Sequence, residues 1–227
     1  MDAQRLPTNV PSESVILLHG LGRTRFAMRK IAAELSNEFH VVNQGYPSRS
    51  HPIETLADLA IESALAACAD ASRVHFVTHS LGGILVRQYL SRHALPQLGH
   101  VVMLGPPNQG SEIVEAFRRT PILTQFFDLL NGPAGRQLGT SSDSRPRSLG
   151  AVDFSLGVIA GNRSVDPVLS RLLPSQSDGK VTVESSRVDG MQDHIVLPVD
   201  HTFMMRDPRV IKQIQTFLRQ GRFKHHD

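Results

Sequence analysis

The sequence predicts one doubly wound α/β domain, in which helices cover both faces of a mostly parallel β-sheet. Three observations support this fold class. Short, continuously apolar runs recur along the chain, stretches with helical character separate them, and no internal repeat is visible. A chain of 227 residues usually folds around one core. We therefore expect residues 1–227 to form a single domain.

The first half of the chain supplies four of the expected strands and three of the helices. Apolar runs of this kind are typical of strands that are buried on both faces of a parallel sheet. The expected strands are residues 15–18, 39–42, 74–77 and 101–104, and the helices between them are residues 26–35, 53–69 and 84–93. The helix of residues 53–69 should begin just after Pro52.

The second half resumes this pattern after an irregular stretch. Strands at residues 156–160 and 195–197 and a last helix at residues 209–218 complete the domain. Residues 111–151 break the alternation. We interpret them as an insertion over the carboxyl ends of the strands, which forms a lid or cap.

Two short helices are expected within this insertion, at residues 113–118 and 122–130. The second is dense in apolar side chains, among them Phe126 and Phe127. These side chains could pack on the core or form the wall of an acyl pocket, and the sequence allows both at once. Phe126 and Phe127 are therefore our candidates for substrate binding.

Charge and cysteine content exclude several classes of protein. The formal net charge is only +3 and the basic residues are scattered, so we expect no nucleic-acid partner. The basic tail from Arg219 to His226 is typical of a solvated terminus. The single cysteine, Cys68, excludes an intramolecular disulfide and is expected to be buried in a helix.

The sequence also indicates where in the cell the protein is located. The first residues contain no apolar core of a signal peptide, and no apolar segment is long enough to span a membrane. We therefore expect a soluble, cytoplasmic protein with no integral membrane segment, although an exported chain that had lost its leader would show the same pattern. The oligomeric state is left open.

The most informative motif is the segment Thr78-His79-Ser80-Leu81-Gly82-Gly83, between an apolar run and a helical stretch. A serine on such a turn is typical of the nucleophile elbow, whose strain lifts the hydroxyl clear of the sheet. Ser80 is therefore the candidate nucleophile. The residues two before and two after it must be small: Gly82 is, whereas Thr78 replaces the usual glycine and needs local room.

A serine hydroxyl needs a general base within hydrogen-bonding reach. In this type of fold the base follows the nucleophile and lies at the end of a late strand. His201 fits best, because it follows an apolar run and precedes the last helix. His194 is the rival, but it lies before that strand, at the sheet edge opposite the expected site.

The base in turn needs a carboxylate that orients it. Asp178 lies in an Asp-Gly turn between the last two strands, and Asp166 lies closer to the end of the first of these. Their positions alone do not separate them. Asp200 is less suitable, because it adjoins His201 and neighbours in an extended segment point apart.

Two backbone N–H groups should stabilise the oxyanion of the transition state. Leu81, the residue after the nucleophile, supplies one at the start of a helix whose dipole assists. The glycines of His19-Gly20-Leu21-Gly22 let the loop after the first strand approach a substrate closely, and the backbone of Leu21 is the candidate for the other. No His-Glu-x-x-His motif or Cys/His cluster indicates a metal site.

From residue 15 to 217 the chain resembles the α/β-hydrolase superfamily, and within it small lipase-like esterases. The resemblance rests on five segments: His19-Gly20-Leu21-Gly22, His79-Ser80-Leu81-Gly82-Gly83, Gly105-Pro106-Pro107-Asn108-Gln109-Gly110-Ser111, Asp178-Gly179-Lys180-Val181 and Val199-Asp200-His201-Thr202-Phe203. It implies a reduced version of that fold and favours Asp178 as the acid. It also implies ester hydrolysis through an acyl-enzyme, without a metal or an organic cofactor.

The expected activity is therefore that of a serine hydrolase acting on a small ester or lipid substrate. An acyltransferase or a thioesterase would use the same triad, and the sequence does not separate these. A non-catalytic binding protein on the same scaffold is the third alternative, which the full set of catalytic candidates disfavours.

Overall fold

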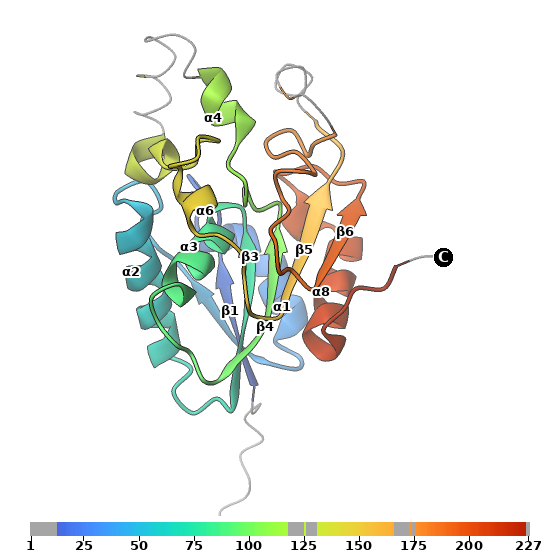
Figure 1. Ribbon diagram of the computed structural model, residues 1–227. Coiled ribbons are helices and arrows are strands. Elements are labelled where there is room, and N and C mark those ends of the chain that lie inside the picture. Colours follow the sequence, from blue (N-terminus) through green and yellow to red (C-terminus); the bar gives the residue numbers. More distant parts are fainter. Residues whose placement is uncertain (1–12, 118–124, 126–130, 166–172, 174–175, 226–227) are drawn as a thin grey trace, which may run out of the picture.

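The computed structural model describes residues 13–117, 125, 131–165, 173 and 176–225. These residues contain a six-stranded, fully parallel sheet with the order β2-β1-β3-β4-β5-β6 (Figure 1). The strands are β1 (Glu13–Leu18), β2 (His40–Gln44), β3 (Arg73–His79), β4 (Leu98–Leu104), β5 (Leu156–Gly161) and β6 (Asp193–Leu197). The doubly wound fold that the apolar runs predict is confirmed.

The strand order positions the site. β1 pairs with both β2 and β3, so the chain winds outward in one direction before β3 and in the other direction after it. Leu18, the last residue of β1, is paired with Thr78 of β3. The loops that follow these two strands therefore emerge side by side, at the place where such sheets bind ligands.

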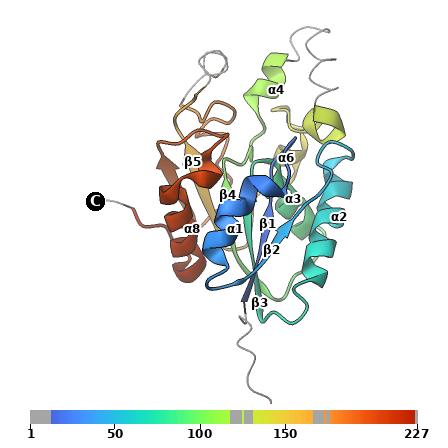
Figure 2. The same cartoon turned by 180° about the vertical axis from the view of Figure 1, so that it is seen from behind.

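Helices cover both faces of the sheet. Figure 1 shows α2 (Ile53–Ala66) and α3 (Leu81–Leu90) on one face, and Figure 2 shows α1 (Arg29–Leu35) and α8 (Pro208–Gln220) on the other. Ile16 and Leu18 pack toward the first pair, whereas Val15 and Leu17 pack toward the second. Because alternate residues of a strand point to opposite faces, a continuous apolar run supplies both cores.

Several helix boundaries differ from the expected ones. The helix expected at residues 26–35 divides into a 3₁₀ helix, η1 (Arg25–Met28), and α1, because Met28 has φ −93° and ψ 0° rather than α-helical angles. The helix expected at residues 84–93 begins at Leu81, since the turn at Ser80 is itself the N-cap. Cys68 is buried as expected, but it follows α2 instead of lying within it.

The insertion lies beyond the carboxyl ends of the strands, and Figure 1 shows α4 (Glu112–Phe117) above this edge. The expected helix at residues 113–118 is thus present as α4. A further short helix, α6 (Arg145–Ser148), lies in the Arg- and Ser-rich passage. The expected helix at residues 122–130, with Phe126 and Phe127, falls outside the described residues.

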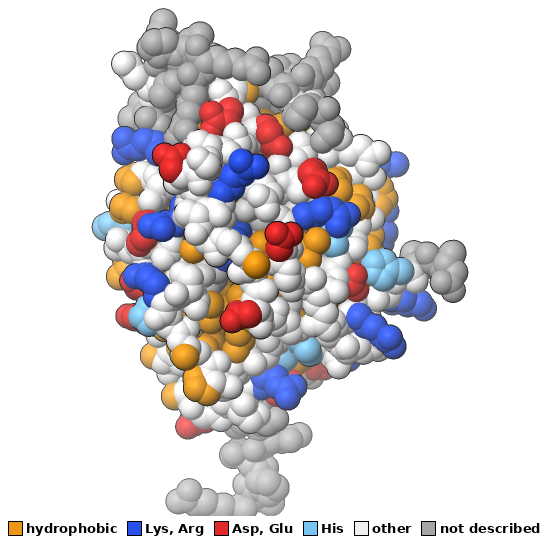
Figure 3. Space-filling model, viewed as in Figure 1, with side chains coloured by type: hydrophobic (Ala, Val, Ile, Leu, Met, Phe, Trp, Pro, Cys, Tyr) orange, Lys and Arg blue, Asp and Glu red, His pale blue; other side chains and the backbone are white. Residues whose placement is uncertain are grey.

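The surface shows no dominant charge on the face drawn in Figure 3. Lys and Arg side chains are interspersed there with Asp and Glu side chains, and no continuous basic stripe runs across it. Among the helices that the structure describes, none combines the length and the apolar character needed to traverse a bilayer.

Candidate active site

Ser80 occupies the sharp turn between β3 and α3. It has φ 53° and ψ −119°, and among the described residues it is the only one other than glycine with a positive φ. Such a conformation costs of the order of 1–3 kcal/mol in a residue with a side chain. The surrounding bonds maintain it: the Ser80 N–H donates to the carbonyl of Leu104, and the Ser80 carbonyl accepts from the Gly83 N–H. The strain expected at the nucleophile is therefore present.

Small residues around Ser80 are required by the packing. A Cβ atom on Gly82 would lie 2.7 Å from the Leu18 carbonyl oxygen, and one on Gly20 would lie 2.8 Å from His79 Nδ1. Thr78 is fully buried, and its Oγ1 would be 3.3 Å from a Cβ on Gly83. The absent side chain of Gly83 thus provides the room that Thr78 needs.

His201 and Asp178 form a buried pair. The Nδ1 atom of His201 is 2.7 Å from Oδ2 of Asp178, and both residues are at most 4% exposed. The backbone adds a second link, because the His201 N–H donates to the Asp178 carbonyl oxygen. A carboxylate can only accept here, so Nδ1 carries the proton and Nε2 is left free to act as a base.

The acid is held by its own turn. Oδ1 of Asp178 accepts from the backbone N–H groups of Lys180 and Val181, at 3.0 and 2.9 Å. Gly179 has φ +97°, a conformation that favours glycine and explains the Asp-Gly dipeptide. Asp178 is therefore the partner of His201, while Asp166 falls outside the described residues. Asp200 points elsewhere, since its Oδ1 accepts from the N–H groups of Thr202 and Phe203.

Two glycines to which we assigned no role from the sequence make room for this pair. A Cβ on Gly105 would lie 2.8 Å from Asp178 Oδ2 and 3.0 Å from His201 Nδ1, and one on Gly161 would lie 2.7 Å from Asp178 Cβ. Gly105 also has φ +52°. Gly105 directly follows β4 and Gly161 is the last residue of β5, and that position at the carboxyl edge is the signal that could have identified them.

His79, next to Ser80, is a further residue whose role the motif alone did not reveal. It is 1% exposed, its Nε2 donates to the carbonyl oxygen of His201 at 3.0 Å, and the two rings lie 4.7 Å apart. Burial, and then the neighbouring His201, hold the pKa of His79 well below its ordinary value. His79 therefore stays neutral and fixes the backbone of the residue that would act as base.

The segment after β4 connects to the loop that carries Asp178. Ser111 Oγ donates to the Lys180 carbonyl oxygen at 3.1 Å, and Asn108 Nδ2 donates to the Ser186 carbonyl oxygen at 2.8 Å. The buried guanidinium of Arg87 in turn donates to Asn108 Oδ1. These bonds explain why the Pro-Pro-Asn-Gln-Gly-Ser segment accompanies the Asp-Gly turn.

The loop after β1 lies against the serine turn. His19 stacks on Tyr46 with ring centroids 4.1 Å apart, and the Tyr46 hydroxyl donates to the His19 carbonyl oxygen. This packing holds the backbone that leads to Leu21. Leu81 is the first residue of α3, where the N–H has no acceptor within the helix. The assignment of Leu21 and Leu81 to an oxyanion hole stays a prediction.

Ser80 and His201 line one cavity of about 260 Å³, together with His79 and Leu21. The two side chains are therefore at the same edge of the sheet, as the proposed chemistry requires. Much of the remaining wall is apolar and comes from the insertion, with the side chains of Ile113, Val114, Phe117 and Leu138. The cavity thus combines a candidate nucleophile with a surface suited to an alkyl chain.

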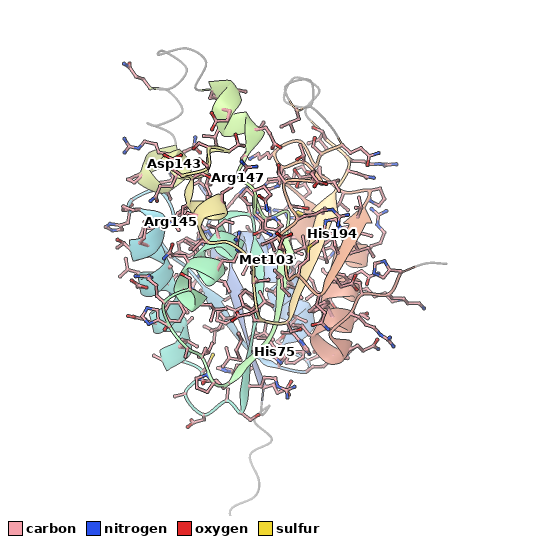
Figure 4. All side chains as sticks on the ribbon, in the orientation of Figure 1. His75, Met103, Asp143, Arg145, Arg147 and His194 are labelled. Atoms are coloured by element: carbon pink, nitrogen blue, oxygen red, sulfur yellow. The ribbon has the colours of Figure 1, made fainter. Side chains whose placement is uncertain are left out.

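The other histidines lie elsewhere. His194 is the second residue of β6, and its Nε2 is 3.0 Å from Ser186 Oγ, so it does not line the cavity of Ser80. Figure 4 places His75 at the lower end of the sheet, away from the insertion. Within the described residues, one group could hold a metal ion, Asp58, Glu62 and His93. Asp58 and Glu62 lie on α2, and Asp58 already pairs with Arg92 at 2.6 Å.

Comparison with protein families assigns the chain. The model of the alpha/beta hydrolase family matches residues 15–214. The chain belongs to the alpha/beta hydrolase family. A comparison with curated protein sequences gives no match.

Solved structures with this hydrolase fold are similar along nearly the whole chain. The mature form of the lipase BlEst2 from Bacillus licheniformis has a TM-score of 0.65 at 18% identity, over 97% of this chain and 96% of the lipase. Its propeptide form has a TM-score of 0.70 at 17% identity, and there this chain spans only 53% of the other. The esterase RhEst1 from Rhodococcus has a TM-score of 0.57 at 16% identity, over 92% of this chain and 90% of the esterase. At such identities the likeness establishes the fold alone.

Proposed function

We propose that this α/β-hydrolase cleaves carboxylic esters through an acyl-enzyme formed on Ser80. The observation that carries the proposal is that a serine held at φ 53° and the base candidate His201 line one cavity, while the carboxylate of Asp178 is bonded to Nδ1 of His201. The lipases and esterases among the structural neighbours support the choice of an ester.

In the first step His201 Nε2 takes the proton of the Ser80 hydroxyl while Oγ attacks the carbonyl carbon of the ester. The negative charge then develops on the carbonyl oxygen, where the N–H groups of Leu21 and Leu81 would stabilise it. His201 gives the proton to the departing alkoxide, and the acyl group remains on Ser80. A water molecule, activated by the same imidazole, releases the carboxylic acid.

Asp178 would act throughout as the partner of the imidazolium. Its hydrogen bond at Nδ1 selects the tautomer that leaves Nε2 free, and its negative charge stabilises the cation that forms during each step. His79 remains neutral because its pKa is lowered by burial, so its ring adds no positive charge beside the imidazolium of His201.

We also propose that the insertion of residues 111–151 serves as a cap. It supplies Ile113, Val114, Phe117 and Leu138 to the cavity wall, so its position bears directly on the acyl pocket. Phe126 and Phe127 remain candidates for the same wall, and their assignment rests on the sequence alone.

The test is the turnover of p-nitrophenyl butyrate by the purified chain and by Ser80→Ala. We expect the variant to keep the circular dichroism spectrum and to lose essentially all turnover, because the nucleophile is gone. Thr202→Ala, next to the proposed base but outside the cavity, is the matched control and should retain activity. Equal turnover by Ser80→Ala and the parent chain would refute the proposal.

A further inference from the structure

Two cations face the cavity of Ser80. Arg23 and Lys180 both line it, whereas no described Asp or Glu residue does. Neither side chain lies within ion-pair distance of a described carboxylate. The described wall of the cavity therefore has an unneutralised positive charge as well as an apolar side.

The backbone fixes both cations near the nucleophile. The Lys180 N–H donates to Asp178 Oδ1, and its carbonyl oxygen accepts from Ser111 Oγ. The Arg23 N–H donates to the Gly20 carbonyl oxygen, in the loop that contacts the serine turn. Each residue is thus anchored to a segment that forms the site, while its charged end remains available.

The two cations also affect each other. Partial desolvation, and then the positive charge of Arg23, lower the pKa of Lys180, while Asp178 acts in the opposite direction. Arg23 and Lys180 both contribute to the low pKa of His79, which adjoins Ser80. Like charges brought together in this way repel each other, and an anion placed between them relieves that repulsion.

The positive potential extends outward from the cavity. Arg23 also lines a neighbouring hollow of about 290 Å³, to which Arg29 and Arg206 contribute and no described carboxylate does. Clefts lined by charge of one sign concentrate ligands of the opposite sign and raise their rate of association. An anion is therefore favoured beside the cavity of Ser80 as well as within it.

We infer that the substrate is an amphiphilic ester that carries a phosphate-type anion close to the scissile bond, with Arg23 and Lys180 as its binding residues. The apolar wall from the insertion would hold the alkyl chain, and the two cations would hold the anion on the other part of the ester. This inference rests on the proposed function, because it assigns a substrate class to the same site.

The first test is binding without turnover. Isothermal titration calorimetry with n-octyl phosphate should give saturable binding to the parent chain, and Arg23→Gln/Lys180→Gln should weaken it at least about tenfold, since two charge-assisted contacts are lost. Arg222→Gln/Lys224→Gln removes an equal charge from two exposed residues after α8 and should leave the dissociation constant unchanged. Raised salt should weaken binding to the parent chain. Equal affinity of the parent and the double variant would overturn the inference.

The second test compares two esters that differ only in the anion, 1-octanoyl-glycerol 3-phosphate and 1-octanoyl-glycerol. The ratio of their kcat/KM values should favour the phosphate ester and fall at least about tenfold in the double variant, mainly through KM. A ratio that stays the same would contradict the inference and leave ester hydrolysis intact. If octyl phosphate binds but Ser80→Ala does not affect hydrolysis, the proposed function fails and the anion site remains. Thermal unfolding curves of Arg23→Gln and Lys180→Gln show whether each variant is still folded, so that weaker binding can be ascribed to the lost contact.

Discussion

Strand β3 carries a buried histidine near each end, and the two differ in how their ring atoms are bonded. At the amino end, His75 Nε2 is 3.1 Å from Glu13 Oε2, and its Nδ1 accepts from the backbone N–H of His100 at 2.9 Å. At the carboxyl end, His79 Nε2 donates to the His201 carbonyl oxygen, but Nδ1 has no partner among the described residues.

This difference extends to the two edges of the sheet. Around His75 both ring nitrogens are bonded and the neighbouring rings of Phe39 and His100 pack against it. Around His79 there is an unpaired nitrogen, a serine with positive φ and a cavity that has two cations in its wall. Strain and unpaired polar groups persist only where the surrounding structure holds them, and they concentrate at functional sites.

The largest expected effect comes from removing the carboxylate at the carboxyl edge of the sheet, and the matched change at the amino edge is its control. Asp178→Asn should lower kcat for p-nitrophenyl butyrate by about a thousandfold or more, because the amide no longer stabilises the imidazolium and can reverse the tautomer. Glu13→Gln, which changes the partner of His75, should leave kcat nearly unchanged. If Asp178→Asn retained most of its activity, the two edges would not differ as we describe.

Removal of each β3 histidine should separate stability from activity. Both His75→Ala and His79→Ala delete a fully buried ring, so we expect each to lower the free energy of unfolding in urea by about 2–4 kcal/mol. Only His79→Ala should also lower kcat, since it releases the backbone of His201. An equal loss of kcat in both variants would mean that the effect on His201 is general rather than local.

The buried histidines also predict how stability depends on pH. Burial lowers the pKa of His19, His75 and His79 in the folded chain, and it lowers that of His194 to about 4. As the pH falls, these histidines therefore bind protons in the unfolded chain first, at about pH 6.5. Their contribution to the free energy of unfolding is complete above that pH and is lost as the pH falls below it.

Urea unfolding at pH 7.5 and 5.0 tests this expectation. The free energy of unfolding should be smaller at pH 5.0, and His194→Gln should reduce the difference, because its titration no longer contributes. His194 lies away from the cavity of Ser80, so activity should persist in this variant. Equal or greater stability of the parent chain at pH 5.0 would contradict the expectation.

The smallest effect should come from relieving the strain at Ser80. Ser80→Gly places at φ 53° the residue that adopts this region most readily, so we expect it to raise the free energy of unfolding by about 1 kcal/mol relative to Ser80→Ala. Both variants lack the nucleophile, which removes activity from the comparison. A less stable glycine variant would show that the turn is not strained in solution.

The sequence predicted more of the fold than of the support around the site. The strands could be predicted because their apolar runs serve two faces at once. Ser80 and His201 could be proposed because each follows a strand, whereas Asp178 was favoured over Asp166 by the family resemblance. Gly105 and His79 lie in the quoted motifs, but their roles were not predicted, since these depend on close contacts with residues distant in the sequence. The division of the helix at residues 26–35 was missed because both parts share one apolar pattern.

The most direct test of the central claim is covalent labelling of the folded chain with an alkyl fluorophosphonate, followed by peptide mass spectrometry. We predict one adduct, on Ser80, formed in the parent chain and nearly absent in His201→Ala, because the hydroxyl reacts only when an imidazole can take its proton. Ser91→Ala, which alters an exposed serine after α3, should label as the parent chain does. Labelling that is absent from Ser80, or that is unaffected by the loss of His201, would contradict the account.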